Sequence, residues 1–143
     1  MNGGLGLSIG SLRKPLEDAP ATRVGNRVLL VDDNAGIRAA LTDLLTAEGL
    51  VIVGQAVNGV EAISMSRELH PDLVLLDDQM PELTGREALP HIRRESPGAR
   101  ILLFSAGVEP IGSADSPDAA LAKGSHPSQL LHLIRGLLAV TAG

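Results

Sequence analysis

Short aliphatic runs alternate with stretches of helical periodicity along most of the chain, and no other feature restricts the fold as strongly. Each run has the length and composition of a buried strand. The runs are at residues 28–31, 51–53, 73–76 and 101–104, with a weaker fifth run at 119–122. Strands that alternate with helices in this way predict an α/β domain, in which helices cover both faces of a parallel sheet.

The helices are predicted from apolar residues that recur every three or four positions. They span about 37–45, 60–69 and 84–94, and the last one begins at Pro127. We expect Pro90 to interrupt the third helix by a kink or an early end, because proline lacks the N–H group that helical hydrogen bonding requires; the ordinary alternative is a tolerated local irregularity. The residues predicted to face the core include Ile37, Ala40, Leu41, Leu44, Leu45, Val60, Ala62, Ile63, Leu130, Leu131, Ile134, Leu137 and Leu138.

The composition excludes several classes of function. Phe104 is the only aromatic residue, so the core must be aliphatic and base stacking on a nucleic acid is not expected. The formal net charge is −5 without a basic block, which argues against direct binding of DNA or RNA. The chain has no cysteine, and no apolar run reaches the length of a membrane span or resembles a signal peptide. We therefore expect a cytoplasmic protein without membrane insertion.

Composition also divides the chain into parts. Residues 1–26 are rich in Gly, Ser and Pro and lack sustained periodicity, which predicts a flexible N-terminal extension. The pattern of strands and helices occupies residues 27–140, which we expect to form one domain. Residues 141–143 are left as a short tail.

Polar residues follow four of the predicted strands at the point where each strand ends. Asp32 and Asp33 follow the first strand, Asp77 the third, Ser105 the fourth and Lys123 the fifth. Each alone has an ordinary explanation, such as a helix cap for either member of the acidic pair or a solvated surface cation for the lysine. Parallel strands, however, bring their carboxyl ends to one edge of the sheet, where such folds bind ligands. We therefore expect these residues to converge.

Three carboxylates at one sheet edge repel one another. A pair of like charges about 4 Å apart costs roughly 4 kcal/mol at an effective dielectric constant of about 20. A hard cation relieves this repulsion, and an all-oxygen site without His or Cys favours Mg²⁺. One carboxylate can then attack phosphorus, while Lys123 and Ser105 neutralise and hydrogen-bond the phosphoryl oxygens. The sequence contains no GxxxxGK[ST] or GxGxxG loop, so nucleotide binding is not indicated.

Four segments of the sequence resemble the receiver domains of two-component response regulators, of which chemotaxis regulators are an example. The segments are Val28-Leu-Leu-Val-Asp-Asp33, Asp72-Leu-Val-Leu-Leu-Asp-Asp-Gln-Met-Pro81 with Gly85 beyond it, Phe104-Ser-Ala106 and Ala122-Lys-Gly124. They occur in the family's order across about residues 27–139, and the D-x-x-M-P-x-x-x-G segment from Asp77 is specific by itself. The resemblance implies a flavodoxin-like sheet with the strand order 2-1-3-4-5.

The resemblance also implies roles for the matching residues. Asp77 resembles the phosphoacceptor, which takes a phosphoryl group from a sensor histidine kinase or a phosphotransfer protein in a Mg²⁺-dependent reaction. Ser105 resembles the hydroxyl that follows the phosphoryl group, and Lys123 resembles its ion-pair partner. The implied metal ligands are Asp33 directly, Asp32 through water, Asp77, and Gln79 through its backbone carbonyl. The protein would then be no enzyme for other substrates, since it assists only its own phosphorylation and dephosphorylation.

The sequence departs from the family where other members report their activation. The position three residues before Lys123 is Ala120, where an aromatic side chain usually rotates on activation. Residues 107–118 contain two prolines and two glycines and no apolar stripe, so we predict that the family's fourth helix is shortened or disordered. Asp78 falls at a variable position, and the resemblance gives it no role.

Two functions fit these observations. The first is a stand-alone receiver, phosphorylated on Asp77, whose output is contact with an unidentified downstream protein or onward relay of the phosphoryl group. The second is a pseudo-receiver that binds a protein without phosphorylation. Ala120 and the irregular segment 107–118 favour the second function, whereas the intact acidic cluster opposes it. A further interpretation is that the chain is a fragment of a longer regulator.

Overall fold

The computed structural model describes residues 25–105 and 116–142. The elements in these residues are β1 (Arg27–Val31), α1 (Ala35–Ala47), β2 (Val51–Ala56), α2 (Gly59–Leu69), β3 (Leu73–Asp77), α3 (Gly85–Glu95), β4 (Arg100–Ser105), β5 (Ala119–Ala122) and α4 (Pro127–Ala142). The strands pair in parallel in the order β2-β1-β3-β4-β5, which confirms the predicted sheet. The predictions of an irregular segment within 107–118 and of an extension at 1–26 fall almost entirely outside the described residues.

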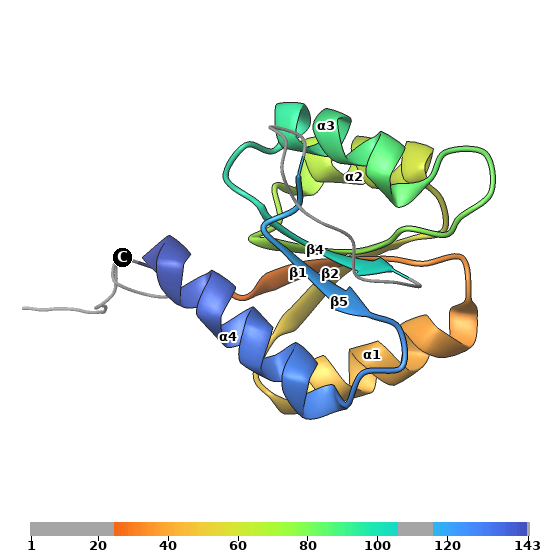
Figure 1. The fold of residues 1–143 in the computed structure, drawn as a ribbon. Helices are drawn as coiled ribbons and strands as arrows, with labels where there is room; N and C mark the ends of the chain where they lie inside the picture. Colours follow the sequence, from red (N-terminus) through yellow and green to blue (C-terminus); the bar gives the residue numbers. More distant parts are fainter. Residues whose placement is uncertain (1–24, 106–115, 143) are drawn as a thin grey trace, which may run out of the picture.

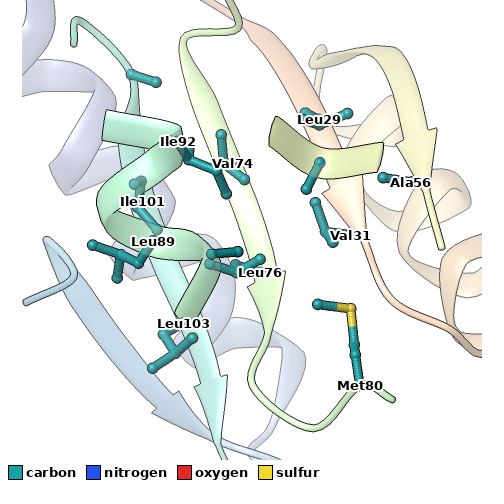
Figure 2. Close-up of a cluster of buried hydrophobic side chains, with 13 residues drawn as sticks. Leu29, Val31, Ala56, Val74, Leu76, Met80, Leu89, Ile92, Ile101 and Leu103 are labelled. Carbon is teal, nitrogen blue, oxygen red and sulfur yellow. The ribbon is translucent and has the colours of Figure 1, made fainter. Parts of the chain in front are cut away.

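The sheet lies between two layers of helices, with α2 and α3 on one face and α1 and α4 on the other (Figure 1). Because successive side chains of a strand point to opposite faces, β3 contributes to both cores. Leu76 packs with Leu89 and Ile92 of α3 (Figure 2), whereas Leu75 packs with Ile134 of α4 on the other face. None of the described helices is long and apolar enough to cross a membrane.

Side-chain caps determine where the helices beside the sheet edge begin. The Asn34 side chain accepts a hydrogen bond at 2.9 Å from a backbone N–H in the first turn of α1. The ordinary explanation of Asp32 or Asp33 as the cap of this helix is therefore wrong. Thr84 and Glu87 form a reciprocal capping box at the start of α3. Helix capping thus leaves the acidic pair at the end of β1 available for another role.

Some expectations about the helices are wrong. Ile37 is 43% exposed and Val60 is 61% exposed, because both lie in the first turn of their helices on the side that faces solvent. Ala40 is also exposed. Helix α3 continues from Gly85 to Glu95 through Pro90. Its capping box and the buried residues on either side of the proline stabilise the helix enough to tolerate one missing hydrogen bond.

Candidate functional site

Asp32, Asp33 and Asp77 lie together at the carboxyl edge of the sheet. The first two follow β1, and Asp77 ends the neighbouring strand β3. One carboxylate oxygen from each residue lies within 4.8 Å of the other two. Asp77 is 2% exposed and Asp32 is 6% exposed, whereas Asp33 is open to solvent. The parallel pairing of β1 with β3 therefore brings together the three acidic residues that the sequence indicated.

The environment of Asp32 makes its ionised form costly. Burial is the largest effect and raises the pKa of Asp32 above its ordinary value. The Asn34 N–H, which donates to Asp32 Oδ1 at 2.8 Å, lowers this pKa. The charges of Asp77 and Asp33 raise it, and Lys123 lowers it. A cation among the carboxylates would offset the same electrostatic cost.

The Asp77 carboxylate is held by two donors on one oxygen. Lys123 Nζ lies 2.7 Å from Asp77 Oδ1, and the Gln79 N–H donates to the same oxygen at 2.9 Å. Gln79 is close in sequence, but Lys123 follows β5, which is two strands away from β3 in the sheet. The fold thus places an ammonium group against a carboxylate that is almost shielded from water, where their attraction is stronger than at an open surface.

Ser105 lies at the same edge, at the end of β4, the strand between β3 and β5. The residue is 4% exposed. Its carbonyl oxygen accepts a hydrogen bond from the Lys123 N–H at 2.8 Å. It follows Phe104, which is the partner of Asp77 in the register between β3 and β4. The hydroxyl-bearing residue is therefore adjacent in the sheet to both the buried acid and the lysine.

Gly85 allows α3 to start against the backbone of the acidic loop. A Cβ atom added to Gly85 would lie 2.3 Å from the Asp77 carbonyl oxygen and 2.9 Å from Asp78 Cα. The Gly85 N–H instead donates to the Asp78 carbonyl oxygen at 3.1 Å. Only a residue without a side chain permits this close approach, which explains the glycine at the end of the D-x-x-M-P-x-x-x-G segment.

Two arginines that the sequence did not single out contact the loops of the site. Arg38 of α1 donates to the Asp32 carbonyl oxygen and, through Nε, to Gln55 Oε1 at 3.1 Å. Arg86 of α3 contacts Asp78 Oδ2 through Nε at 3.0 Å. Arg38 joins α1 to the loop after β1 and to β2, and Arg86 joins α3 to the loop after β3. Each contact links two different elements, so the spacing of residues within one helix or one strand does not predict it. The sequence pattern therefore gave no signal for these contacts.

The residues present fit a hard divalent cation next to a phosphoryl group. Asp32, Asp33 and Asp77 offer carboxylate oxygens, which Mg²⁺ prefers as protein ligands. The repulsion that contributes to the raised pKa of Asp32 shows that positive charge is favourable among them. Lys123 adds a second positive charge on the side of Asp77. This arrangement can stabilise an anionic group that is transferred to a carboxylate oxygen.

Comparisons with known proteins agree with this geometry. The chain is 43% identical over 83 residues to chemotaxis protein CheY of Thermotoga maritima. The match covers 58% of this chain and 69% of that protein. It is 39% identical over 117 residues to the protein-glutamate methylesterase/protein-glutamine glutaminase of Archaeoglobus fulgidus, of which it spans 34%. This match covers 73% of the chain.

Among solved structures, the fold is similar to that of response regulator TrrA of Thermotoga maritima in complex with Mg(2+)-BeF. The TM-score is 0.71 at 33% sequence identity, and the match covers 79% of this chain and 99% of TrrA. Residues 28–135 also match the model of the response regulator receiver domain. These residues include the clustered acids and Lys123. The chain therefore belongs to the family of response regulator receiver domains of two-component signalling.

Proposed function

We propose that the protein accepts a phosphoryl group on the Asp77 carboxylate in a Mg²⁺-dependent reaction. The donor is a phosphohistidine of a sensor histidine kinase or of a phosphotransfer protein. One observation carries the proposal: the buried Asp77 carboxylate lies beside two further carboxylates and 2.7 Å from Lys123 Nζ. A carboxylate that faces both a cation site and an ammonium group is arranged to carry additional negative charge.

In this proposal the metal ligands come from two loops. Asp33 binds Mg²⁺ directly, Asp32 binds it through water, Asp77 uses a carboxylate oxygen, and Gln79 uses its backbone carbonyl. The bound ion supplies positive charge that polarises the phosphoryl oxygens. The Gln79 N–H, which donates to Asp77 Oδ1, fixes the orientation of the attacking carboxylate. Lys123 compensates the negative charge of the phosphoryl oxygens that come next to this carboxylate during transfer.

The transfer forms one bond and breaks one. An Asp77 oxygen bonds to phosphorus as the P–N bond to the donor imidazole breaks, and the imidazole nitrogen keeps the electron pair. Lys123 and the Ser105 hydroxyl then contact the phosphoryl oxygens, which carry about −1.5 to −2 charges at neutral pH in place of the single charge of the carboxylate. This charge shifts the equilibrium between two packings of the adjacent surface. Hydrolysis restores the carboxylate, so the domain acts on itself and not on another substrate.

The choice of Mg²⁺ rests on the donor set and is supported by a relative. The solved TrrA structure is described as a complex with Mg(2+)-BeF, and TrrA is 33% identical to this chain. The signalling pathway in which the protein acts is a separate question from the choice of metal. Because the chain spans only 34% of the methylesterase that it resembles, the activity of that longer protein is not part of the proposal.

The experiment that tests the proposal is labelling with a small phosphodonor, phosphoramidate, followed by mass spectrometry of the intact protein. The wild type should gain the mass of one phosphoryl group with Mg²⁺ and none with EDTA. Asp77→Asn should gain none, because an amide oxygen is a poor nucleophile. Asp43→Asn, on the exposed side of α1, is the matched control and should be labelled like the wild type. Labelling of Asp77→Asn to the wild-type extent would refute the proposal.

The alternative function is a phosphorylation-independent binding module. Ala120 on β5 favours it, since alanine has no side-chain rotamer that could change on activation. A titration with Mg²⁺ and beryllofluoride, followed by NMR, separates the two functions. The proposed function predicts shifts of the Ser105 and Lys123 amides, and their absence would favour the binding module.

We further propose that residues 27–140 are the receiver domain, flanked by an extension at 1–26 and a tail at 141–143. Its output is contact with a downstream protein or relay of the phosphoryl group, without direct contact to nucleic acid. Stand-alone action and a cytoplasmic location remain predictions. The full open reading frame tests whether an output domain is attached, and fractionation of cells that express the tagged protein tests the location.

A further inference from the structure

The loop between β3 and α3 carries Gln79, whose backbone carbonyl the proposed function assigns to the metal. The first residue of this loop, Asp78, has four polar groups engaged. Its backbone N–H donates to the Phe104 carbonyl oxygen at 2.9 Å, and its own carbonyl oxygen accepts from the Gly85 N–H at 3.1 Å. Asp78 Oδ1 accepts from the Arg86 N–H at 3.2 Å, and Oδ2 accepts from Arg86 Nε at 3.0 Å. Asp78 therefore ties the end of β3 to both β4 and α3.

Asp78 does not belong to the carboxylate cluster itself. The oxygen atoms that gather within 4.8 Å come from Asp32, Asp33 and Asp77. The Asp78 carboxylate is instead directed toward α3, where both of its oxygens accept hydrogen bonds from Arg86. The Asp78 side chain is 17% exposed and the Arg86 side chain 39% exposed. An ion pair of this exposure adds little to global stability, so its main effect is on local geometry.

We infer that Asp78 and Arg86 are a positioning pair, which holds the β3–α3 loop in the shape that lets the Asp77 carboxylate and the Gln79 carbonyl bind one cation. The inference rests on the proposed function, because that function makes these oxygens metal ligands. Gly85 allows the helix to approach, and the pair then fixes the loop against the helix at Arg86. Residues that orient metal ligands without touching the metal typically change its affinity by about 10- to 100-fold.

The charges of the two side chains give a test that separates positioning from electrostatics. If only charge mattered, Asp78→Ala would weaken Mg²⁺ binding, whereas Arg86→Ala would strengthen it. Positioning predicts that both substitutions weaken binding, because each removes the bond from Arg86 Nε to Asp78 Oδ2, and Asp78→Ala also removes the bond from the Arg86 N–H. The double variant should bind about as weakly as Asp78→Ala alone, since Asp78→Ala already removes both bonds that the Asp78 carboxylate accepts from Arg86.

The experiment is titration of each purified full-length variant with Mg²⁺ alone, followed by NMR or calorimetry. The expected result is a dissociation constant about tenfold higher for Asp78→Ala and the double variant, with a smaller increase for Arg86→Ala. Glu95→Ala and Arg94→Ala make the same charge changes elsewhere on α3 and should bind like the wild type. Arg86→Lys keeps the charge but not the fixed geometry of the guanidinium, so it should also bind more weakly than the wild type.

Tighter binding by Arg86→Ala, or dissociation constants for both alanine variants equal to the wild type, would overturn the inference. If Asp78→Ala does not fold, Asp78→Asn takes its place, because the amide oxygen keeps the bond from the Arg86 N–H. Asp78→Asn cannot accept from Arg86 Nε through its amino group, so weaker binding is still expected. Failure of the wild type to bind Mg²⁺ would contradict the proposed function, whereas failure of the variants to differ from it would contradict only the positioning pair.

Discussion

At the scale of single residues, the two buried carboxylates of the site meet different partners. Asp77 lies 2.7 Å from the Lys123 ammonium, whereas Asp32 accepts a hydrogen bond from the neutral Asn34 N–H. Burial raises the pKa of Asp32, and the nearby charges of Asp77 and Asp33 raise it further. A raised pKa means that the folded state binds the Asp32 proton more tightly than the unfolded state does. The stability gained from Asp32 is therefore complete at low pH and is lost as pH rises through its folded pKa.

Asp32→Asn should consequently stabilise the metal-free protein at neutral pH. The asparagine keeps an oxygen that can accept from the Asn34 N–H, but it carries no charge. The midpoint of thermal unfolding in EDTA should be higher for the variant than for the wild type at about pH 7. The difference should shrink as pH falls through the raised pKa of Asp32, because the carboxyl group of the wild type then becomes protonated. Added Mg²⁺ should raise the midpoint of the wild type more than that of the variant. A lower midpoint for the variant at neutral pH would contradict this reading of Asp32.

Gly85→Ala should destabilise the protein by about 1–3 kcal/mol, the usual range when a side chain is forced into a packed site. The added Cβ would stand 2.3 Å from the Asp77 carbonyl oxygen, so the backbone of the acidic loop must move. Gly136→Ala in α4 is the matched control, since an added Cβ meets no atom within 4 Å there. It should stabilise the protein by about 0.4–1 kcal/mol. Urea unfolding followed by circular dichroism measures both effects, and equal responses of the two variants would rule out the proposed clash.

At the scale of elements, β5 is the short edge strand that delivers Lys123 to the site. Its start is fixed by Asp118, whose Oδ2 accepts from the Ile101 N–H at 2.8 Å and from Arg93 Nη2 at 3.1 Å. The Asp118 N–H donates to the Ile101 carbonyl oxygen at 2.9 Å. Arg93 also donates to the Ser116 carbonyl oxygen at 2.8 Å. The Asp118 carboxylate thus connects β5 to β4 and α3. These contacts fix the register of β5 and therefore the position of Lys123 at its end.

Asp118→Ala should destabilise the protein by about 1–3 kcal/mol, because the Ile101 N–H loses its acceptor. The loss of stability should affect β5 most, so the rate of amide hydrogen exchange at 119–122 should rise more than the rate in β3. Asp43→Ala removes the same charge from the exposed side of α1 and should change the free energy of unfolding by less than about 0.5 kcal/mol. Hydrogen exchange and urea unfolding measure the two effects. Unchanged exchange in β5 would show that Asp118 does not anchor the strand.

At the scale of the whole molecule, much of the fold could be predicted from the alternation of apolar runs. The uninterrupted apolar run 73–76 indicated the central strand, and the five strand positions followed from the same pattern. The residues after the strands could be assigned to one edge because parallel topology leaves no other arrangement. The gathering of Asp32, Asp33 and Asp77 was predictable for this reason.

Other features depend on three-dimensional packing that no period in the sequence encodes. Apolar spacing alone assigned Ile37 and Val60 to the core, but the spacing does not show which turns of a helix are in contact with the sheet. Pro90 was expected to interrupt α3, because the sequence shows the local effect of a proline on a helix. It does not show that the helical residues on both sides of Pro90 are buried against the sheet. The Asp78–Arg86 contact joins a loop to a helix start, so it became visible only in the folded chain.

The central claim is that Asp77 is the residue that receives the phosphoryl group. The most direct measurement is to label the wild type with phosphoramidate and Mg²⁺, reduce the product with borohydride, and sequence its peptides by mass spectrometry. Reduction of an aspartyl phosphate leaves homoserine at the modified position. The account predicts homoserine at position 77, only when Mg²⁺ is present during labelling. Homoserine at position 32, 33 or 78, or none in a sample that gained the phosphoryl mass, would contradict it.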